Sequence, residues 1–305
     1  MRIIVDAMGG DNAPEELVKG AVMGAKLCDA EFTLVGDEDA ISKVAKENGL
    51  DISSFEIVDA KGVVEMTDDP ITVVRKKGDS SMVVGMKMLS EGKGDAFVST
   101  GNTGALFTAA TLIVRRVKGI KRAGIGAVLP LSTPVLLMDS GANVTVTPEY
   151  LEDFAMMGSV YMNKIYGISE PKVGLLNNGT EECKGTELQI EAHKLLGGNE
   201  NINFVGNVEA NKVPFSECDV LVTDGFTGNI LLKSIEGVGK LMLSSMKGLF
   251  YQTFITKLAG AMVKKHVGTL KKKFDASEHG GAPLLGLKKA VVKAHGNSNA
   301  KAFSN

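Results

Sequence analysis

The segment Asp95-Ala-Phe-Val-Ser-Thr-Gly-Asn-Thr-Gly-Ala-Leu-Phe107 recurs later in the chain as Asp219-Val-Leu-Val-Thr-Asp-Gly-Phe-Thr-Gly-Asn-Ile-Leu231. Each copy predicts a short buried strand, a polar glycine turn and the start of a helix. In an open α/β sheet such a turn offers backbone N–H groups and the positive end of a helix dipole to an anion. The repeat therefore indicates a duplicated α/β unit whose paired turns face one cleft and hold a phosphate-type ligand. The alternative is that Gly-Thr-Gly only forms tight turns.

Short apolar runs alternate with helical patterns along most of the chain. Thr147-Pro148-Glu149 predicts the start of a helix over Tyr150–Tyr166, a second helix is expected from Asn12 to about Cys28, and a third begins after Ser298. This alternation predicts a mostly parallel sheet with helices on both faces, in one α/β domain over residues 1–305. The expected strands are Arg2–Asp6, Phe32–Val35, Phe55–Val58, Ala96–Ser99, Val135–Met138, Val173–Leu176, Phe204–Val205, Val220–Thr223 and Val291–Ala294.

The composition is that of a soluble globular protein. The chain has 305 residues, 44% of them hydrophobic and 23% charged, with a formal net charge of −2. No apolar run approaches the roughly 18 residues of a membrane span. The first residues enter a strand directly, which predicts that no targeting segment precedes the fold. Cys28, Cys183 and Cys218 lack CxxC spacing, and the scattered histidines suggest no metal site, so we expect reduced thiols, a cytoplasmic location and no cofactor.

Four glycine-containing turns follow candidate strands, and ligands of open α/β sheets bind at such strand ends. They are residues 6–12, 99–104, 177–185 and 224–229. Neither the P-loop pattern nor the dinucleotide-binding pattern GxGxxG is present. ATP and NAD are therefore not the expected ligands. The candidate phosphate- or substrate-binding residues are Asp6, Gly9, Gly10, Asp11, Thr100, Gly101, Asn102, Thr103, Gly104, Asn177, Gly179, Glu182, Gly225, Thr227 and Gly228. The candidate catalytic residues are Lys184, Asn229, Asp224 and His295. Such a set suits a small oxyanion beside a reacting carbonyl.

Each candidate also has a simpler interpretation. Asp6 and Asp224 could cap the helices that follow them. Lys184 could be a solvated lysine in a first helical turn, although the helix dipole disfavours a cation there. Cys183 beside it is expected to be an incidental thiol rather than a nucleophile. His295 is either a site residue at a strand exit or a buried core histidine.

Several motifs, in order from residue 1 to 305, resemble the bacterial phosphate acyltransferases of phospholipid synthesis, the PlsX family. They are Ile4–Pro14, Ser99–Ala105, Asn177–Glu187, Val222–Asn229, Gly280–Gly286 and Lys293–Gly296. The resemblance implies a three-layer α/β/α, Rossmann-like fold of the isopropylmalate dehydrogenase and phosphate acetyltransferase type, with two intertwined halves. It also implies a homodimer. Family members usually carry one more C-terminal helix than this chain, so a truncated C-terminal helix is expected.

The resemblance implies transfer of a long-chain fatty acyl group from acyl carrier protein to inorganic phosphate, which gives acyl phosphate for phospholipid synthesis. Phosphate is itself a nucleophile, so the enzyme needs positioning and charge stabilisation rather than a covalent intermediate. We expect Thr100–Gly104 and Thr227–Asn229 to hold phosphate. Lys184 would assist there, stabilise the oxyanion or protonate the departing thiolate, while Asp6, Asp11 and Asp224 orient the donors. The alternatives are an enzyme acting on acyl-CoA and a non-catalytic, membrane-recruited scaffold.

Residues 248–273 predict an amphipathic, lysine-rich helical arm. Phe250, Phe254, Leu258 and Met262 recur every fourth residue, and Lys257, Lys264 and Lys265 supply positive charge near them. One interpretation is a dimer or core helix with a solvated lysine tail. The other is an exposed arm that meets the anionic inner face of the plasma membrane and the acidic carrier protein. We therefore expect peripheral membrane association, with no role for nucleic acid.

Overall fold

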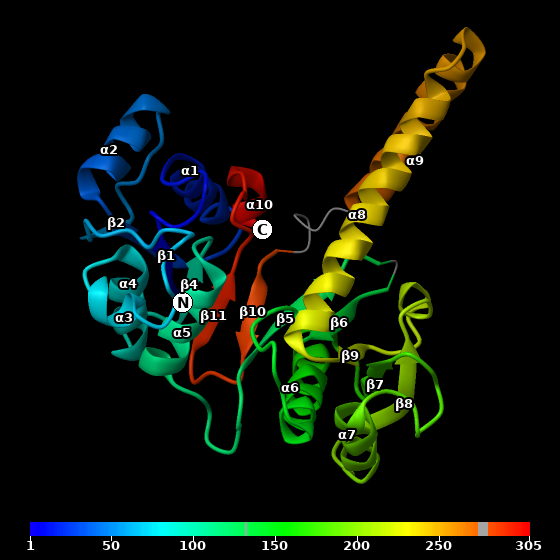
Figure 1. Cartoon of the computed structure of the whole chain (residues 1–305). Coiled ribbons are helices and arrows are strands. Elements are labelled where there is room, and N and C mark those ends of the chain that lie inside the picture. The colour runs from blue at the N-terminus through cyan, green and yellow to red at the C-terminus, as the bar shows by residue number, and fades with distance from the viewer. Residues whose placement is uncertain (132, 274–279) are drawn as a thin grey trace. The chain divides into compact units, whose positions relative to one another are not determined.

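The computed structural model describes residues 1–131, 133–273 and 280–305, and for residues 264–267 and 269–273 it describes the backbone alone. The chain divides into two compact units. Unit 1 comprises Met1–Gly126 and Gly280–Asn305, and unit 2 comprises Ala127–His279. Because unit 2 is inserted between two segments of unit 1, the two halves are interleaved in the sequence (Figure 1).

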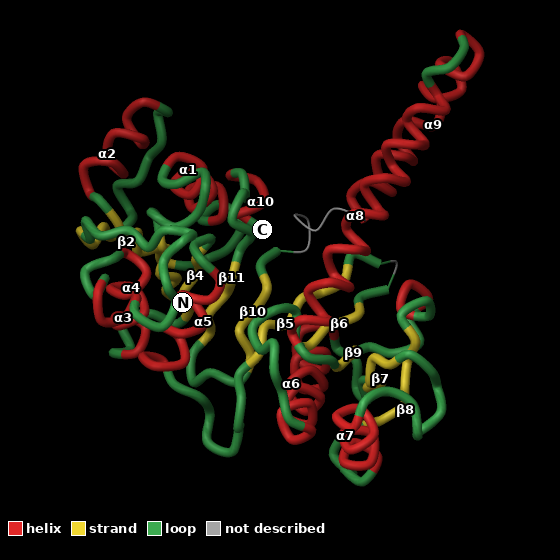
Figure 2. The backbone as a smooth tube through the Cα atoms, in the orientation of Figure 1, coloured by secondary structure: helices red, strands yellow, loops and turns green. Residues whose placement is uncertain are grey.

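Unit 1 contains a mixed, mostly parallel sheet in the order β3-β2-β1-β4-β11-β10-β5, in which β10 is antiparallel to both of its neighbours. Figure 2 shows the helices of unit 1 on both sides of its strands. The elements are β1 (Arg2–Asp6), α1 (Glu15–Gly24), β2 (Glu31–Gly36), α2 (Glu38–Glu47), β3 (Glu56–Asp59), α3 (Val73–Lys76), α4 (Ser81–Ser90), β4 (Ala96–Ser99), α5 (Thr103–Ala109), the π-helical η1 (Ala110–Val114), β5 (Gly124–Leu129), β10 (Ala282–Leu285), β11 (Ala290–Lys293) and α10 (Ala300–Ser304).

Helices cover both faces of the unit 1 sheet because successive strand residues point to opposite sides. On β1, Ile4 faces α4, where it lies close to Gly85. The next residue, Val5, belongs to a core cluster with Val18 of α1 and Leu34 of β2, and Phe303 of α10 packs against that cluster. The result is the expected arrangement of three layers.

Unit 2 contains the parallel strands β6-β9-β7-β8. Leu136 and Val220 face Gly158 of α6, whereas Leu137 and Leu221 lie in a core cluster against which the start of α8 packs. The elements are β6 (Val135–Met138), α6 (Pro148–Tyr166), β7 (Lys172–Asn177), α7 (Glu187–Gly197), β8 (Asn203–Glu209), the 3₁₀-helical η2 (Val213–Phe215), β9 (Val220–Val222), α8 (Gly225–Phe250) and α9 (Phe254–Lys273).

The expected strands and the alternation of βα units are confirmed, with shifted ends in places. The helix expected to run to Cys28 ends at Gly24, and β5 and β10 were missed. β10 escaped detection because Ala-Pro-Leu-Leu has no alternating pattern and contains a proline, which is rare inside strands.

The helical arm expected over residues 248–273 falls on two helices rather than one. The long helix α8 ends at Phe250, and a new helix begins at Phe254 after a short turn. The backbone N–H of Thr256 donates to Thr253 Oγ1 at 3.1 Å, while the N–H of Thr253 donates to Thr256 Oγ1 at 2.9 Å. This reciprocal cap starts α9, so the arm is a hairpin of two helices (Figure 1).

Candidate active site

Three strand exits of unit 1 meet at the carboxyl edge of its sheet, where β1, β4 and β11 are parallel neighbours. The Thr100 hydroxyl donates to the carbonyl of Gly9. The Asp11 N–H donates to the carbonyl of Gly296 at 2.9 Å, and the Ala294 N–H to that of Ser99 at 3.0 Å. The first two predicted turns and the segment that carries His295 are therefore joined by direct hydrogen bonds.

Gly10 permits this close approach of the backbone. Its φ is +90°, and a Cβ at this position would lie 2.5 Å from Thr100 Oγ1 and 2.9 Å from the carbonyl oxygen of Gly296. A side chain here would both strain the backbone and push the turns apart. The sequence motif Met8-Gly-Gly-Asp11 thus has a local structural reason.

Asp6 is fully buried under these turns and caps no helix. Its carboxylate accepts hydrogen bonds from the hydroxyls of Ser81 and Ser99, both at 2.6 Å. Burial raises the pKa of Asp6, and the hydrogen bonds oppose that rise. Helix α1 begins after Pro14 without a side-chain cap. Asp6 therefore fixes the surrounding turns from beneath, as an orienting residue would.

The turn after β4 leaves backbone donors free. Asn102 caps α5 by accepting from the N–H of Ala105 at 3.0 Å, and its Nδ2 donates to the carbonyl of Met66 at 2.8 Å. Among the described residues, the N–H groups of Thr103 and Gly104 have no acceptor. Two adjacent, free N–H groups at a helix start can receive an oxyanion.

The corresponding turn after β9 is organised differently. Asp224 caps α8, accepting from the Thr227 N–H at 2.9 Å and from the Thr227 hydroxyl at 2.7 Å. The Gly225 N–H donates to the carbonyl of Asn143, and the Gly228 N–H donates to that of Asp224. The capping interpretation of Asp224 is correct, and the predicted donors Gly225, Thr227 and Gly228 already have partners within the chain.

Asn229 lies one residue beyond this cap and is half-buried. Its side chain is beside Gly141, where a Cβ would come within 3.8 Å of Asn229 Oδ1. Among the described residues its amide makes no hydrogen bond, so it can bind a ligand.

Asp139, which was not among the predicted site residues, directly follows β6, much as Asp6 ends β1. Asp139 is fully buried and accepts from the N–H groups of Gly141 and Ala142 at 3.1 Å and of Asn143 at 2.7 Å. Its own carbonyl oxygen would lie 2.0 Å from a Cβ at Gly228. The signal was available, since an acid, Ser140 and a glycine directly follow a predicted strand.

The loop after β7 presents Lys184 to solvent. The Asn177 amide donates to the carbonyl of Lys184 at 3.1 Å, which fixes this part of the loop. Within the described part of the chain the Lys184 ammonium has no partner. Helix α7 begins only at Glu187, behind a capping box of Thr186 and Gln189, so Lys184 does not lie in a first helical turn. A fixed backbone carrying a free cation suits a substrate-binding role.

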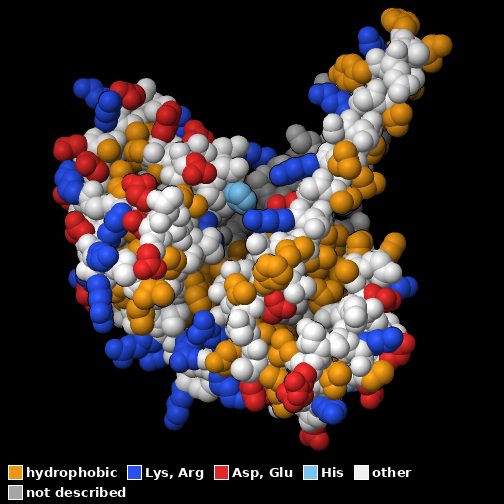
Figure 3. Space-filling view, viewed as in Figure 1, with side chains coloured by type: hydrophobic (Ala, Val, Ile, Leu, Met, Phe, Trp, Pro, Cys, Tyr) orange, Lys and Arg blue, Asp and Glu red, His pale blue; other side chains and the backbone are white. Residues whose placement is uncertain are grey.

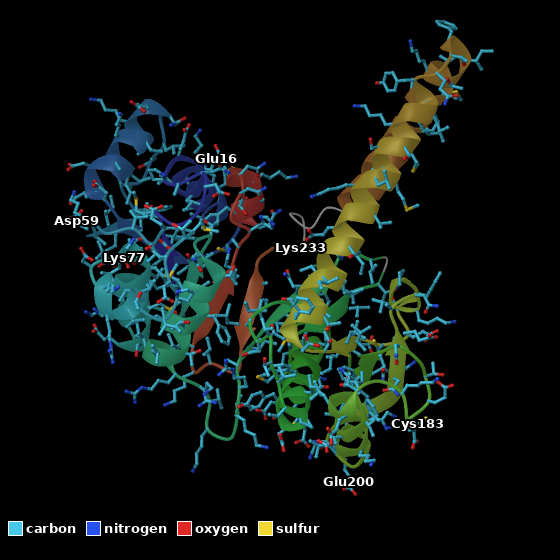
Figure 4. All side chains as sticks on the ribbon, in the orientation of Figure 1. Glu16, Asp59, Lys77, Cys183, Glu200 and Lys233 are labelled. Atoms are coloured by element: carbon cyan, nitrogen blue, oxygen red, sulfur yellow. The ribbon has the colours of Figure 1, made fainter. Side chains whose placement is uncertain are left out.

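The other predicted residues of this loop differ in exposure. Gly179 is buried, and Glu182 and Cys183 are exposed. Figure 4 labels Cys183 at the outer edge of the loop. The incidental role expected for Cys183 stays a prediction.

His295 is exposed rather than buried in a core, and it lies two residues beyond the end of β11. Its Nδ1 accepts weakly from the Asn297 N–H at 3.5 Å. Two residues earlier lies Lys293, which was not predicted as a site residue. It is half-buried and donates to the carbonyl of Thr100 at 3.1 Å. Its position near the end of the predicted strand Val291–Ala294, within the motif Lys293–Gly296, could have indicated a site residue.

The predicted site residues thus form two groups, one at the strand exits of each unit. The first group contains Asp6, Gly9, Gly10, Asp11, Thr100–Gly104 and His295, and the second contains Asn177, Gly179, Glu182, Lys184, Asp224, Gly225 and Thr227–Asn229. Their convergence on one ligand stays a prediction. In the described residues no group of three or more His, Cys, Asp or Glu side chains is arranged to hold a metal ion.

The hairpin of α8 and α9 exposes apolar side chains. Figure 3 shows hydrophobic side chains along its surface. Phe254 is 83% exposed and Met262 78%, and Leu258 is also exposed. Phe250 differs from them, because it is half-buried and packs against Gly260 of the opposite helix. Lys257 is exposed, whereas the side chains of Lys264 and Lys265 lie outside the described residues. No helix in the described chain combines the length and apolarity that crossing a bilayer requires.

Comparison with known proteins identifies the family. The family model described as "Fatty acid synthesis protein" matches residues 1–305. A protein of Acetivibrio thermocellus named "Phosphate acyltransferase" is 47% identical over 100% of this chain and 90% of its own length. The chain belongs to the phosphate acyltransferase family. A protein of the same name from Oceanobacillus iheyensis is 46% identical over 100% of this chain and 91% of its own length. The chain is accordingly an acyltransferase, as the sequence motifs implied.

Solved structures confirm the fold class. A phosphotransacetylase from Streptococcus pyogenes superposes with a TM-score of 0.65 at 19% identity, covering 100% of this chain and 91% of its own. A branched-chain phosphotransacylase from Enterococcus faecalis gives a TM-score of 0.60 at 16% identity, covering 100% and 95% respectively. At this level of identity the likeness establishes the fold alone.

Proposed function

We propose that the chain transfers a fatty acyl group from acyl carrier protein to inorganic phosphate. The observation that carries the proposal is the full-length match to proteins named Phosphate acyltransferase, at up to 47% identity among the relatives given above. The free backbone donors at the strand exits support a reaction that relies on positioning and hydrogen bonds.

The chemistry balances without a covalent enzyme intermediate. An oxygen of phosphate attacks the thioester carbonyl carbon, and a tetrahedral oxyanion forms. Its collapse breaks the C–S bond, releases the carrier's thiolate and leaves acyl phosphate. A proton then reaches the thiolate from a nearby donor or from water, since a simple thiol has a pKa of about 8.5.

Within this proposal phosphate binds the free N–H groups of Thr103 and Gly104. Asp6 acts indirectly by accepting a hydrogen bond from the Ser99 hydroxyl at the start of this turn. Lys184 and Asn229, whose polar groups are free among the described residues, contact phosphate or the oxyanion. Asp224 acts indirectly, because its carboxylate is engaged by Thr227.

We also propose that the helical hairpin binds the inner face of the plasma membrane from the cytoplasm. Exposed Phe254, Ile255, Leu258 and Met262 support this, together with the exposed cation Lys257. Such a segment can enter the boundary between headgroups and acyl chains while lysines contact anionic lipids. A homodimer, expected from the family resemblance, is testable by light scattering during gel filtration.

A comparison of acyl donors tests the proposed substrate. The purified protein is given phosphate with palmitoyl thioesters of acyl carrier protein or of coenzyme A. The proposal expects a higher kcat/KM with the carrier protein thioester. Equal or greater efficiency with acyl-CoA would favour the phosphotransacetylase-type alternative, which the shared fold keeps open. Absence of phosphate-dependent thioester cleavage with either donor would favour the scaffold.

A further inference from the structure

Lys293 is a cation at the end of a core strand. It is the last residue of β11 and pairs in register with Ser99, the last residue of β4. Along β11 it lies on the same face as Val291, which is 1% exposed. Partial burial of an ammonium group costs free energy because the group loses hydration. Hydrogen-bond acceptors or opposite charges nearby must offset that cost.

Backbone carbonyls at the ends of β4 and β11 stabilise the partly buried charge of Lys293. The Lys293 ammonium donates to the carbonyl of Thr100 at 3.1 Å and to that of Ala294. Its third N–H has no acceptor among the described residues. The charged or titratable groups around it are Asp6 and Asp11 after β1 and the exposed His295 beyond its own strand.

These contacts hold one peptide plane from both ends. The carbonyl of Thr100 is bound by Lys293, and the N–H of the same peptide unit, that of Gly101, donates to Ser99 Oγ at 3.0 Å. The Ser99 hydroxyl in turn donates to the buried Asp6. A continuous chain of hydrogen bonds therefore fixes the orientation of this peptide, from which the turn of Asn102–Gly104 continues.

We propose that Lys293 is a positioning residue for phosphate binding, which holds the Thr100 carbonyl away from the substrate and supplies the positive charge that offsets Asp6 and Asp11. This inference rests on the proposed function. Phosphate carries two negative charges at alkaline pH, and two carboxylates near its turn would repel it. A cation beneath the turn lowers that repulsion and requires no direct contact with the reacting atoms.

The protonation of Lys293 supplies a distinctive signature. Burial lowers the pKa of Lys293 to about 8, while Asp11 and Asp6 oppose the shift. The residue is therefore cationic below pH of about 8 and loses its charge as the pH rises through that value. Phosphate affinity should fall over the same range. Arginine stays protonated there and can donate to the same carbonyls.

Steady-state kinetics with acyl carrier protein thioester and varied phosphate, from pH of about 6.5 to 9.5, test the inference. For Lys293→Met we expect the phosphate KM at neutral pH to rise about 10-fold or more, with a smaller change in kcat. For Lys293→Arg we expect near-normal phosphate KM at neutral pH and loss of the alkaline rise in KM. Lys288→Met, at an exposed position before β11, is the matched control and should resemble wild type.

An unchanged phosphate KM in folded Lys293→Met would overturn the inference. So would an alkaline rise in KM that Lys293→Arg shares with wild type, because the ionisation of phosphate itself is common to both proteins. If Lys293→Met does not fold, the alkaline rise in the phosphate KM of Lys293→Arg, compared with wild type, still tests the inference. Failure of the wild-type protein to use any thioester would instead overturn the proposed function.

Discussion

Asn102 and Asp224 cap the helices that follow the two copies of the sequence repeat, but they do so from positions that differ by two residues. Asn102 aligns with Phe226 of the second copy, and Asp224 aligns with Thr100 of the first. Helix α8 therefore starts two residues earlier in the repeat than α5. Equivalent residues of the two copies offer different donors, so the duplicated motif does not make a duplicated site.

Replacement of Asp224 by alanine should destabilise the protein. The carboxylate accepts two hydrogen bonds from Thr227, and loss of an N-cap typically costs about 0.5 to 2 kcal/mol. Urea denaturation should show a lower midpoint, and Asp224→Asn should retain most of the stability because asparagine also caps helices. Unchanged midpoints for the alanine variant would mean that the cap does not stabilise α8.

Replacement of Lys184 by alanine should reduce turnover rather than stability. The side chain is exposed and its ammonium has no partner in the described chain, so little packing is lost. Removal of one preorganised charge-stabilising donor costs about 10²-fold or more in kcat. Lys194→Ala, on the surface of α7, is a control of the same type. Near-normal turnover of folded Lys184→Ala would remove this lysine from the mechanism.

Alanine at Asn102 and at Asn229 should have different effects. Asn102 is committed to the α5 cap and to the carbonyl of Met66, so its loss should lower stability together with phosphate affinity. Asn229→Ala should lower turnover at normal stability, since its amide is free among the described residues. If both turns serve one transition state, the double variant should be non-additive in kcat/KM. Strict additivity would indicate that the second copy has a structural role only.

Replacement of Phe254 or Leu258 by glutamate should abolish membrane binding without loss of activity. Both side chains are exposed on the hairpin, so the substitutions remove no core packing. Wild type should co-sediment with phosphatidylglycerol-containing vesicles at low salt and dissociate at high salt. Gln252→Glu makes the same charge change in the exposed turn without loss of apolar surface, and it should bind nearly as wild type does.

The opposite result for the hairpin would also be informative. Unfolding or altered oligomeric state of Phe254→Glu and Leu258→Glu would indicate that a protein partner covers this surface. Normal vesicle binding by both variants would likewise contradict the membrane proposal.

The sequence predicted the sheet and the strand-exit loops because short buried strands bounded by glycine or acids are a local signal. It missed how side chains are used within those loops. Nothing local in the sequence distinguishes the buried Asp6, supported by distant Ser81, from the helix-capping Asp224. Lys293 was overlooked because its contact with Thr100 joins residues 193 positions apart. Such long-range contacts depend on the strand order, which the pattern of the sequence does not specify.

The most direct test of the account is the stoichiometry of the reaction itself. Palmitoyl-acyl carrier protein is incubated with the purified protein with and without phosphate, and free carrier thiol and hydroxylamine-trapped acyl phosphate are both measured. Acyl transfer to phosphate predicts equal amounts of thiol and acyl phosphate, formed only when phosphate is present. Thiol release that is independent of phosphate, or accompanied by free fatty acid alone from the start of the reaction, would contradict it.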